Sequence, residues 1–335
     1  MPAPAARLTK QHRQGALAHS SCKHQEKKEM YTELFDQIQD LKKVRNAIIL
    51  AHSYQRDEVQ DIADFVGDSL GLSREAAKTD AQVIVFAGVH FMAETAAILN
   101  PQKTVLIPDP DAGCSLADTI AADDVRAWKD SNPDGLVVAY VNTTAEVKAL
   151  ADVCVTSANA VSVVSALDPN RPIFFVPDMF LGAHVERETG RKMNLWLGEC
   201  HVHAGIGEKE INLRLSEHSK AEFLIHPECS CGSACLYLKP DAKIMSTEGM
   251  VRYSQSVEAE EFVVATEVGI LHRLQKFSPE KRFFPVKDSA VCEYMKMITL
   301  EKIRDSLLMD QFKVEIDPDI SEKARNALES MIAVG

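Results

Sequence analysis

Short, continuous runs of apolar residues alternate along the chain with segments of helical periodicity. The apolar runs predict buried strands at Ala47–Ala51, Val83–Ala87, Val105–Ile107, Leu136–Tyr140, Ile173–Val176 and Phe223–Ile225. Between them, the periodicity predicts helices at Phe91–Leu99, Ala145–Ala151 and Ala158–Leu167. Unbroken apolar strands between helices are typical of a parallel sheet that is covered on both faces. We therefore expect an α/β fold.

Polar residues follow the predicted strands in a pattern that occurs three times. The segments Ala51-His52-Ser53-Tyr54, Tyr140-Val141-Asn142-Thr143 and Ile225-His226-Pro227-Glu228 begin 89 and 85 residues apart. A second strand that runs into a helix comes after each, at Phe86-Ala87-Gly88, Val155-Thr156-Ser157 and Met245-Ser246-Thr247. A third, with a proline, then follows at Ile107-Pro108-Asp109, Val176-Pro177-Asp178 and Phe284-Pro285-Val286. This order predicts three copies of one α/β unit of about 85 residues.

The repeat also predicts where a ligand binds, because open parallel sheets hold ligands at the carboxyl ends of their strands. Comparable sheet ends carry His52, Tyr54, Tyr140, Asn142, His226 and Glu228. These side chains converge if the three units face a common centre. We expect the units at 30–113, 114–199 and 200–335, with C-terminal helices in the last, after a flexible tail at 1–29.

Composition and charge exclude several classes of protein. The 335 residues include 37 basic and 49 acidic ones, a net charge of −12, which disfavours nucleic-acid partners. No apolar run approaches the ~18 residues of a membrane helix, so we expect no membrane partner. The first 25 residues lack the apolar core of a secretory signal. Eight cysteines without such a signal indicate a reducing, cytoplasmic location.

Three of these cysteines are spaced at roughly one per repeat, at Cys114, Cys200 and Cys292. Spacing alone leaves two interpretations open, three unrelated buried thiols or a three-thiolate metal site at the centre. Thiolates favour soft sites such as iron–sulfur clusters or zinc. The segment from Cys229 to Cys235, with C-x-C-x3-C spacing, is a local competitor for a metal.

Two further motifs carry less weight. Gly67-Asp68-Ser69-Leu70 matches a hydrolase signature, but Gly269 stands where that class needs an Asp before its late His, His272. Cys200-His201-Val202-His203 contains an H-x-H pattern, which we interpret as a histidine pair flanking a thiolate. No nucleotide-binding glycine motif occurs.

At these residues the sequence resembles the quinolinate synthase family, the A protein of de novo NAD biosynthesis. The resemblance runs in order from about residue 47 to residue 300. It rests on AHSYQRDEVQDIADFVGDSL, VIVFAGVHFMAETA, PDPDAGCSLAD, YVNTTAEVKA, VTSANA, HPEC, STEGM and CEYMKMITLEKI. The chain has Ala87 where the family usually has Cys, and about four extra residues separate His226 from Thr247.

The resemblance implies three α/β/α units around a pseudo-threefold axis and a [4Fe-4S] cluster on Cys114, Cys200 and Cys292. It implies that iminoaspartate and dihydroxyacetone phosphate condense to quinolinate, phosphate and water, with an open iron as Lewis acid. It also implies a functional link to an L-aspartate-oxidising enzyme that supplies iminoaspartate. The implied substrate-binding positions are His52, Ser69, Tyr140, Val141, Asn142, Ser157, His226, Pro227, Glu228 and Thr247.

Glu228, Tyr54 and His226 are the candidates for proton transfer, and Tyr54 matches the family's mobile-loop tyrosine. We expect anionic substrates to repel the Glu228 carboxylate and to raise its pKa toward a catalytically useful value. Two other functions stay open. One is an open-cluster hydro-lyase that acts on a hydroxy-acid. The other is a non-catalytic metal-binding or redox protein that uses the Cys229–Cys235 group.

Overall fold

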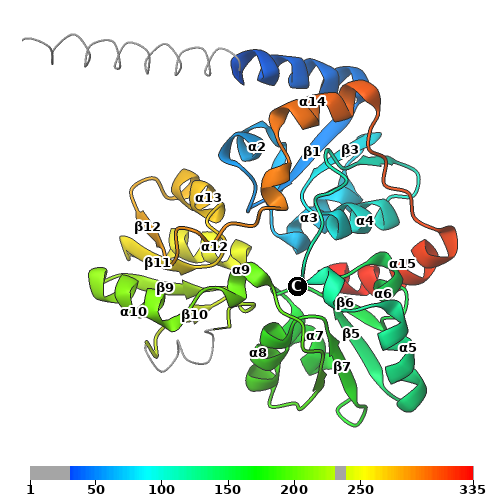
Figure 1. Cartoon of the computed structure of the whole chain (residues 1–335), viewed down its shortest axis with the longest axis vertical. Coiled ribbons are helices and arrows are strands. Elements are labelled where there is room, and N and C mark those ends of the chain that lie inside the picture. The colour runs from blue at the N-terminus through cyan, green and yellow to red at the C-terminus, as the bar shows by residue number, and fades with distance from the viewer. Residues whose placement is uncertain (1–30, 231–238, 335) are drawn as a thin grey trace, which may run out of the picture.

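The computed structural model describes residues 31–230 and 239–334, and its strands form three four-stranded, fully parallel sheets (Figure 1). The first sheet has the order β2-β1-β3-β4. Its strands are β1 (Ala47–His52), β2 (Phe65–Gly67), β3 (Val83–Ala87) and β4 (Thr104–Leu106). Its helices are α2 (Asp57–Ile62), α3 (Ser69–Lys78) and α4 (His90–Leu99), after a helix over residues 31–45.

The second and third sheets repeat this order as β6-β5-β7-β8 and β10-β9-β11-β12. The second unit contains η1 (Ala117–Thr119), α5 (Ala122–Ser131), β5 (Leu136–Tyr140), α6 (Ala145–Lys148), β6 (Val153–Val155), α7 (Ala160–Ala166), β7 (Ile173–Val176), α8 (Met179–Thr189) and β8 (Asn194–Leu195). The third contains α9 (His201–Ala204), α10 (Glu208–Glu217), β9 (Glu222–Ile225), β10 (Lys243–Ile244), α12 (Thr247–Ser256), β11 (Glu261–Ala265), α13 (Ile270–Phe277) and β12 (Arg282–Pro285). The predicted α/β class with three similar units is confirmed.

The central strands are buried along their length because helices cover both faces of each sheet. All five residues of β3 and of β5 are buried, as are all four of β7. Such strands have no solvent face on which polar residues could alternate. The continuous apolar runs of the sequence therefore mark the middle of each sheet.

The predicted alignment of the second and third strands is wrong in part. The counterpart of β6 and β10 is β2, not the strand ending at Ala87, which lies in the third position with β7 and β11. Likewise Ile107 follows β4 and Phe284 lies in β12, whereas Val176 ends β7. The cause is β2, which has only three residues and lies in a stretch rich in Gly and Asp, so its apolar signal is weak.

Two helices after the third sheet return to the other units. After η2 (Met295–Met297), α14 (Leu300–Met309) packs on the first unit, where Arg45 Nη1 donates to Leu307 O at 2.7 Å. The helix α15 (Pro318–Ala333) packs against α4 and β6, between the first and second units (Figure 1). Asn159 Nδ2 donates to Met331 O at 3.0 Å there.

Some predictions are untested by this structure. The unit boundaries stay a prediction, and the tail at 1–29 lies outside the described residues, as do Cys231 and Cys235. Within residues 31–230 and 239–334, no helix has the length and apolar character needed to cross a bilayer.

Candidate active site

A single cavity lies where the three sheets present the carboxyl ends of their strands, with about 710 Å³ of empty space including its open mouth. Twelve of the residues predicted from the sequence line it, namely His52, Tyr54, Ser69, Cys114, Tyr140, Asn142, Ser157, Cys200, His226, Glu228, Thr247 and Cys292. Val141 and Pro227 do not line it. They are the middle residues of two strand-end segments, and their neighbours on both sides face the cavity.

The three predicted cysteines meet in this cavity, each from the segment that follows the last strand of one sheet, β4, β8 or β12. Burial raises the pKa of the Cys114 thiol, and the charges of Cys200 and Cys292 raise it further. Burial and the neighbouring Cys200 likewise raise the pKa of Cys292 to about 11. Three thiolates this close repel one another, so a cation is required to hold all three in the ionised form. The donor set therefore fits a soft, positively charged metal group.

A second possible metal group shares one of these cysteines. The ligand atoms of Cys200, His203 and Glu228 lie within 4.8 Å of one another. This group could hold a single ion, but it leaves the convergence of Cys114 and Cys292 without a role. His203 Nδ1 lies 3.1 Å from Cys200 Sγ and 3.0 Å from Glu228 Oε2. His203 Nδ1 thus lies between the sulfur of Cys200 and the carboxylate of Glu228.

Glu228 is buried and receives hydrogen bonds from all sides of the cavity. The Tyr140 hydroxyl donates to Oε1, Asn142 Nδ2 donates to Oε1 at 3.4 Å, and His203 Nδ1 donates to Oε2. Burial alone raises the pKa of this carboxyl, but the His203 cation, together with the hydrogen bonds, lowers it to about 2. The predicted upward shift of the Glu228 pKa is therefore wrong. The sequence argument counted the repulsion of substrates but not the imidazolium beside the carboxylate.

The opposite shifts of Tyr140 and His203 follow from the same carboxylate. Burial and the Glu228 charge raise the pKa of the Tyr140 phenol well above its ordinary value. Burial lowers the pKa of His203, but the thiolate of Cys200 and the carboxylate of Glu228 raise it well above its usual range. At neutral pH, Tyr140 and His203 are thus both protonated and both donate to an ionised Glu228.

His52 and His226 are related by the repeat and have the same local structure. The Nδ1 atom of His52 accepts the backbone N–H of Tyr54 at 3.2 Å, and Nδ1 of His226 accepts that of Glu228 at 3.4 Å. Burial lowers the pKa of each imidazole to about 3. Both are neutral at pH 7, and because Nδ1 accepts, the proton lies on Nε2, which can donate to a ligand.

Tyr54 reaches across from the first unit to the third. Its hydroxyl lies 2.5 Å from Thr266 Oγ1, which in turn lies 2.9 Å from His203 Nε2. Burial raises the pKa of Tyr54 above its ordinary value, so this hydroxyl also stays protonated. Hydrogen bonds therefore connect Tyr54 to Glu228 through Thr266 and His203.

Helices that begin after the second strand of each sheet supply hydroxyl groups. Ser69 is the first residue of α3, Thr247 is the first residue of α12, and Ser157 lies just before α7. The N-terminal N–H groups of such helices favour anions. Thr247 Oγ1 is buried and has no hydrogen-bond partner within the described ranges. An orphaned hydroxyl facing a cavity is expected to bond a ligand.

Sequence reasoning missed Thr266, Glu267 and Asp178. All three follow the third strand of a sheet, β11 or β7, and a correct alignment of the third strands would have indicated them. Asp178 Oδ1 accepts from Leu181 N at 2.6 Å, and its other oxygen is buried without a partner among the described residues. Burial and the nearby Glu228 raise the pKa of Asp178 well above its ordinary value.

Most of the chain is similar in sequence to one known family of proteins. Residues 36–333 match the family model described as Quinolinate synthetase A protein. The chain is 69% identical over 302 residues to the quinolinate synthase of Thermus thermophilus, covering 90% of this chain and 97% of that protein. It is 52% identical to the quinolinate synthase of Pyrobaculum aerophilum, covering 89% of this chain and 98% of that protein. It is also 52% identical to the quinolinate synthase of Mycobacterium tuberculosis, with 89% and 88% covered.

Proposed function

Since the chain belongs to the quinolinate synthase family of enzymes, we propose that it condenses iminoaspartate with dihydroxyacetone phosphate in this central cavity. The products are quinolinate, phosphate and two molecules of water, which account for all atoms of the two substrates. One observation carries the proposal. A buried, ionised Glu228 with two protonated partners shares one cavity with three cysteines that follow the last strands of the three sheets.

Cys114, Cys200 and Cys292 would hold a [4Fe-4S] cluster, which three protein thiolates leave with one open iron. When bound, such a cluster supplies a Lewis acid that polarises a substrate oxygen. His203 supports the site from the protein side, because its Nδ1–H points at Cys200 Sγ at 3.1 Å. A hydrogen bond to a ligating sulfur orients the ligand and tunes its charge.

The remaining lining suits two anionic substrates. The helix-start hydroxyls of Ser69, Ser157 and Thr247 lie in the same cavity as the two neutral histidines. These groups bind carboxylate or phosphate oxygens without adding net charge, which matters in a chain with a net charge of −12. We propose that His52 and His226 donate from Nε2, and that Thr247 finds its missing partner in a substrate oxygen.

Glu228 is the proposed base, because it is ionised at neutral pH and lines the cavity. It takes a proton from a carbon beside the substrate carbonyl or imine, and it later returns that proton to the departing hydroxyl. The carboxylate then ends as it began, and the proton and hydroxyl leave together as water. Tyr140 and His203 hold the carboxylate in place throughout. Tyr54 is the proposed second proton carrier, through Thr266.

Two related proposals follow from this reaction. Iminoaspartate carries an imine that hydrolyses readily, so an L-aspartate-oxidising enzyme must supply it nearby. The thiols of the site need a reducing environment, which places the reaction in the cytoplasm.

The test is anaerobic reconstitution followed by two measurements. Iron and sulfide per chain should each approach four, and quinolinate should form from iminoaspartate and dihydroxyacetone phosphate in amounts equal to the phosphate released. A cluster with no quinolinate, but with dehydration of a hydroxy-acid, would favour the hydro-lyase instead. Zinc without sulfide would refute the cluster.

A further inference from the structure

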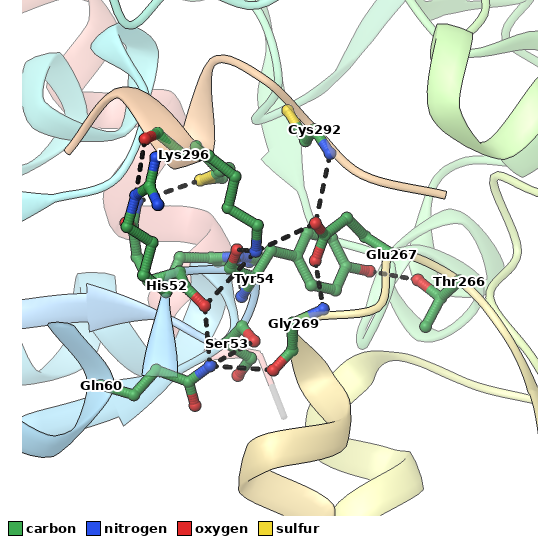
Figure 2. Close-up of polar contacts among 12 residues, drawn as sticks. His52, Ser53, Tyr54, Gln60, Thr266, Glu267, Gly269, Cys292 and Lys296 are labelled. Carbon is green, nitrogen blue, oxygen red and sulfur yellow. Dashed lines mark hydrogen bonds and ion pairs between the residues drawn. The ribbon is translucent and has the colours of Figure 1, made fainter. Parts of the chain in front are cut away.

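An ion pair between a buried carboxylate and a partly exposed ammonium lies between two parts of the site that belong to different units (Figure 2). Glu267 follows β11 and has no exposed surface, and its Oε1 lies 3.0 Å from Nζ of Lys296, a residue of η2. On one side is the Tyr54 segment, residues 53–56. On the other is the Cys292 loop, residues 288–294, which runs directly into η2. Because burial of the carboxylate carries a desolvation cost, the pair is a weak source of stability, and we ask what other role it has.

The carboxylate of Glu267 fixes the Cys292 loop. Its Oε1 accepts the backbone N–H of Cys292 at 3.2 Å, and its Oε2 accepts the backbone N–H of Gly269 at 2.6 Å. The proposed metal ligand is thus held through its own main chain, two bonds from its side chain.

The ammonium of Lys296 fixes the Tyr54 segment. It donates to the carbonyl oxygens of Tyr54 and, at 3.4 Å, of Gln55. In the reverse direction, Arg56 Nε donates to the carbonyl of Lys296 at 2.8 Å. The two segments are therefore tied together at both the main chain and the side chain of Lys296.

The side chains and main chain around the ion pair are closely packed. A Cβ atom on Gly269 would lie 2.7 Å from Lys296 Nζ, 2.8 Å from Glu267 Oε2 and 2.8 Å from the Tyr54 carbonyl carbon. Gln60 Nε2 closes the same space, with donations to Ser53 O at 3.2 Å and Gly269 O at 2.8 Å. We therefore expect a displacement of either segment to displace the other.

We propose that Glu267 and Lys296 are positioning residues that couple the Cys292 loop to the Tyr54 segment, so that loading of the cysteine site places Tyr54 against the cavity. The pair acts through the main chain of one proposed ligand and of one proposed proton carrier. This inference rests on the proposed function, since it takes Cys292 as a ligand.

Coupling of this kind is reciprocal, which makes it measurable from both ends. Hydrogen–deuterium exchange of residues 53–60 is compared in metal-free and iron-loaded protein, and iron release to a chelator is timed. In the wild type, loading should slow exchange of the Tyr54 segment about tenfold or more. In Lys296→Met, loading should leave that exchange unchanged within twofold, and iron should be released to the chelator faster than from the wild type. Lys296→Arg should restore part of both effects.

Three controls separate coupling from general damage. Lys276→Met removes another ion pair between the same two units, with Asp61 at 2.9 Å, and should behave as wild type. Tyr54→Phe removes the Thr266 hydrogen bond but keeps the main-chain contacts, so loading should still protect the segment. If Lys296→Met does not fold with an unpaired Glu267, combining it with Glu267→Gln removes both charges and gives the same test.

Loading-dependent protection that survives in Lys296→Met, or is lost without faster iron release, would overturn the inference. Failure of the proposed function is distinct, because then the wild type takes up no iron. In that case the coupling is still tested in metal-free protein. Lys296→Met must then speed exchange in the Cys292 loop as well as in the Tyr54 segment, and an effect on one alone refutes it.

Discussion

Replacing Glu228 by Gln tests the centre of the proposed mechanism. The amide has the shape of the protonated carboxyl, so Oε1 can still accept from Tyr140 and Asn142. Its NH2 group faces His203 Nδ1, which lies 3.0 Å from the oxygen it replaces, so His203 must give up its Nδ1 proton. The substitution therefore removes one base and one cation while it leaves the packing intact.

The expected loss of rate comes from proton transfer, which contributes typically ~10²–10⁴-fold. We expect a variant with unchanged iron and sulfide, unchanged product binding and a kcat at least ~100-fold lower. The matched control is Glu222→Gln at the other end of β9, where Glu222 also accepts a tyrosine hydroxyl, that of Tyr253, at 2.5 Å. That control should keep full activity.

Stability gives a second measure of the same residue. The pKa of Glu228 is lowered from 4.5 to about 2 on folding. Each pKa unit of difference between the folded and unfolded states corresponds to about 1.4 kcal/mol of free energy. Ionised Glu228 thus contributes about 3 kcal/mol to the free energy of unfolding at pH 7. This contribution is present above pH 4.5 and is lost as the pH falls from 4.5 toward 2. Gln cannot ionise, so it lacks the contribution at every pH.

The assay is a steady-state pH profile with anaerobic urea unfolding of both variants. The wild-type kcat/KM should show no ionisation of Glu228 between pH 5 and 8. A pH dependence of the wild-type kcat/KM with an apparent pKa near 6 to 7, absent from Glu228→Gln, would refute the low pKa. Near-normal turnover in a cluster-replete Gln variant would remove Glu228 from the mechanism and leave Tyr54 or His226 as the proton carrier.

Four other outcomes are expected. Separate replacement of the cysteines by Ala should abolish cluster absorbance at Cys114, Cys200 and Cys292, and at none of the other five. Removal of residues 1–29 should leave kcat and the Tm unchanged, and a large fall in either would show that they pack or bind. Folding keeps His226 neutral below pH 6.5, so the free energy of unfolding should fall as the pH drops from 6.5 toward 3. In His226→Asn, the dependence of the free energy of unfolding on pH over this range should be smaller by about 1.4 kcal/mol per pH unit. Gly269→Ala should lower the free energy of unfolding by about 1–3 kcal/mol in a urea titration, because its Cβ has no room.

Most strands that were predicted from the sequence are central strands, buried on both faces. The exceptions are the edge strand β4, which was predicted from Val105–Ile107, and the central strand β11, which was not predicted. Each central strand is an unbroken apolar run, and the polar residues that follow β1, β5 and β9 mark their shared place in the repeat. The edge strand β8 was not predicted, because Asn194–Leu195 is only two residues long and half polar. The edge strand β10 (Lys243–Ile244) is equally short, and the prediction located only the segment directly after it, Met245-Ser246-Thr247. They exist because a longer neighbour offers them hydrogen bonds.

The cavity was predictable in outline but not in its charges. The polar residues that follow the strands predicted the histidines and Glu228, and the spacing of about one cysteine per repeat predicted the three cysteines. Neither argument needed a distance. Protonation states depend on contacts across units, such as that of His203 with Glu228, and these appear only in three dimensions. The contact of Lys296 with Tyr54 joins residues 242 positions apart. No local sequence pattern in either segment predicts this contact.

The position of α15 has a consequence for how the molecule is assembled during synthesis. This helix fills the joint between the first and second units, yet it is encoded after the third. Arg74 and Asn159, from those two units, both bond main-chain carbonyls in the segment at the end of α15. Each sheet can form as it emerges from the ribosome, since domains fold largely in order of synthesis. The contacts that α15 makes with the first two units can form only after all three units have been translated, so the cavity between the units reaches its final shape late.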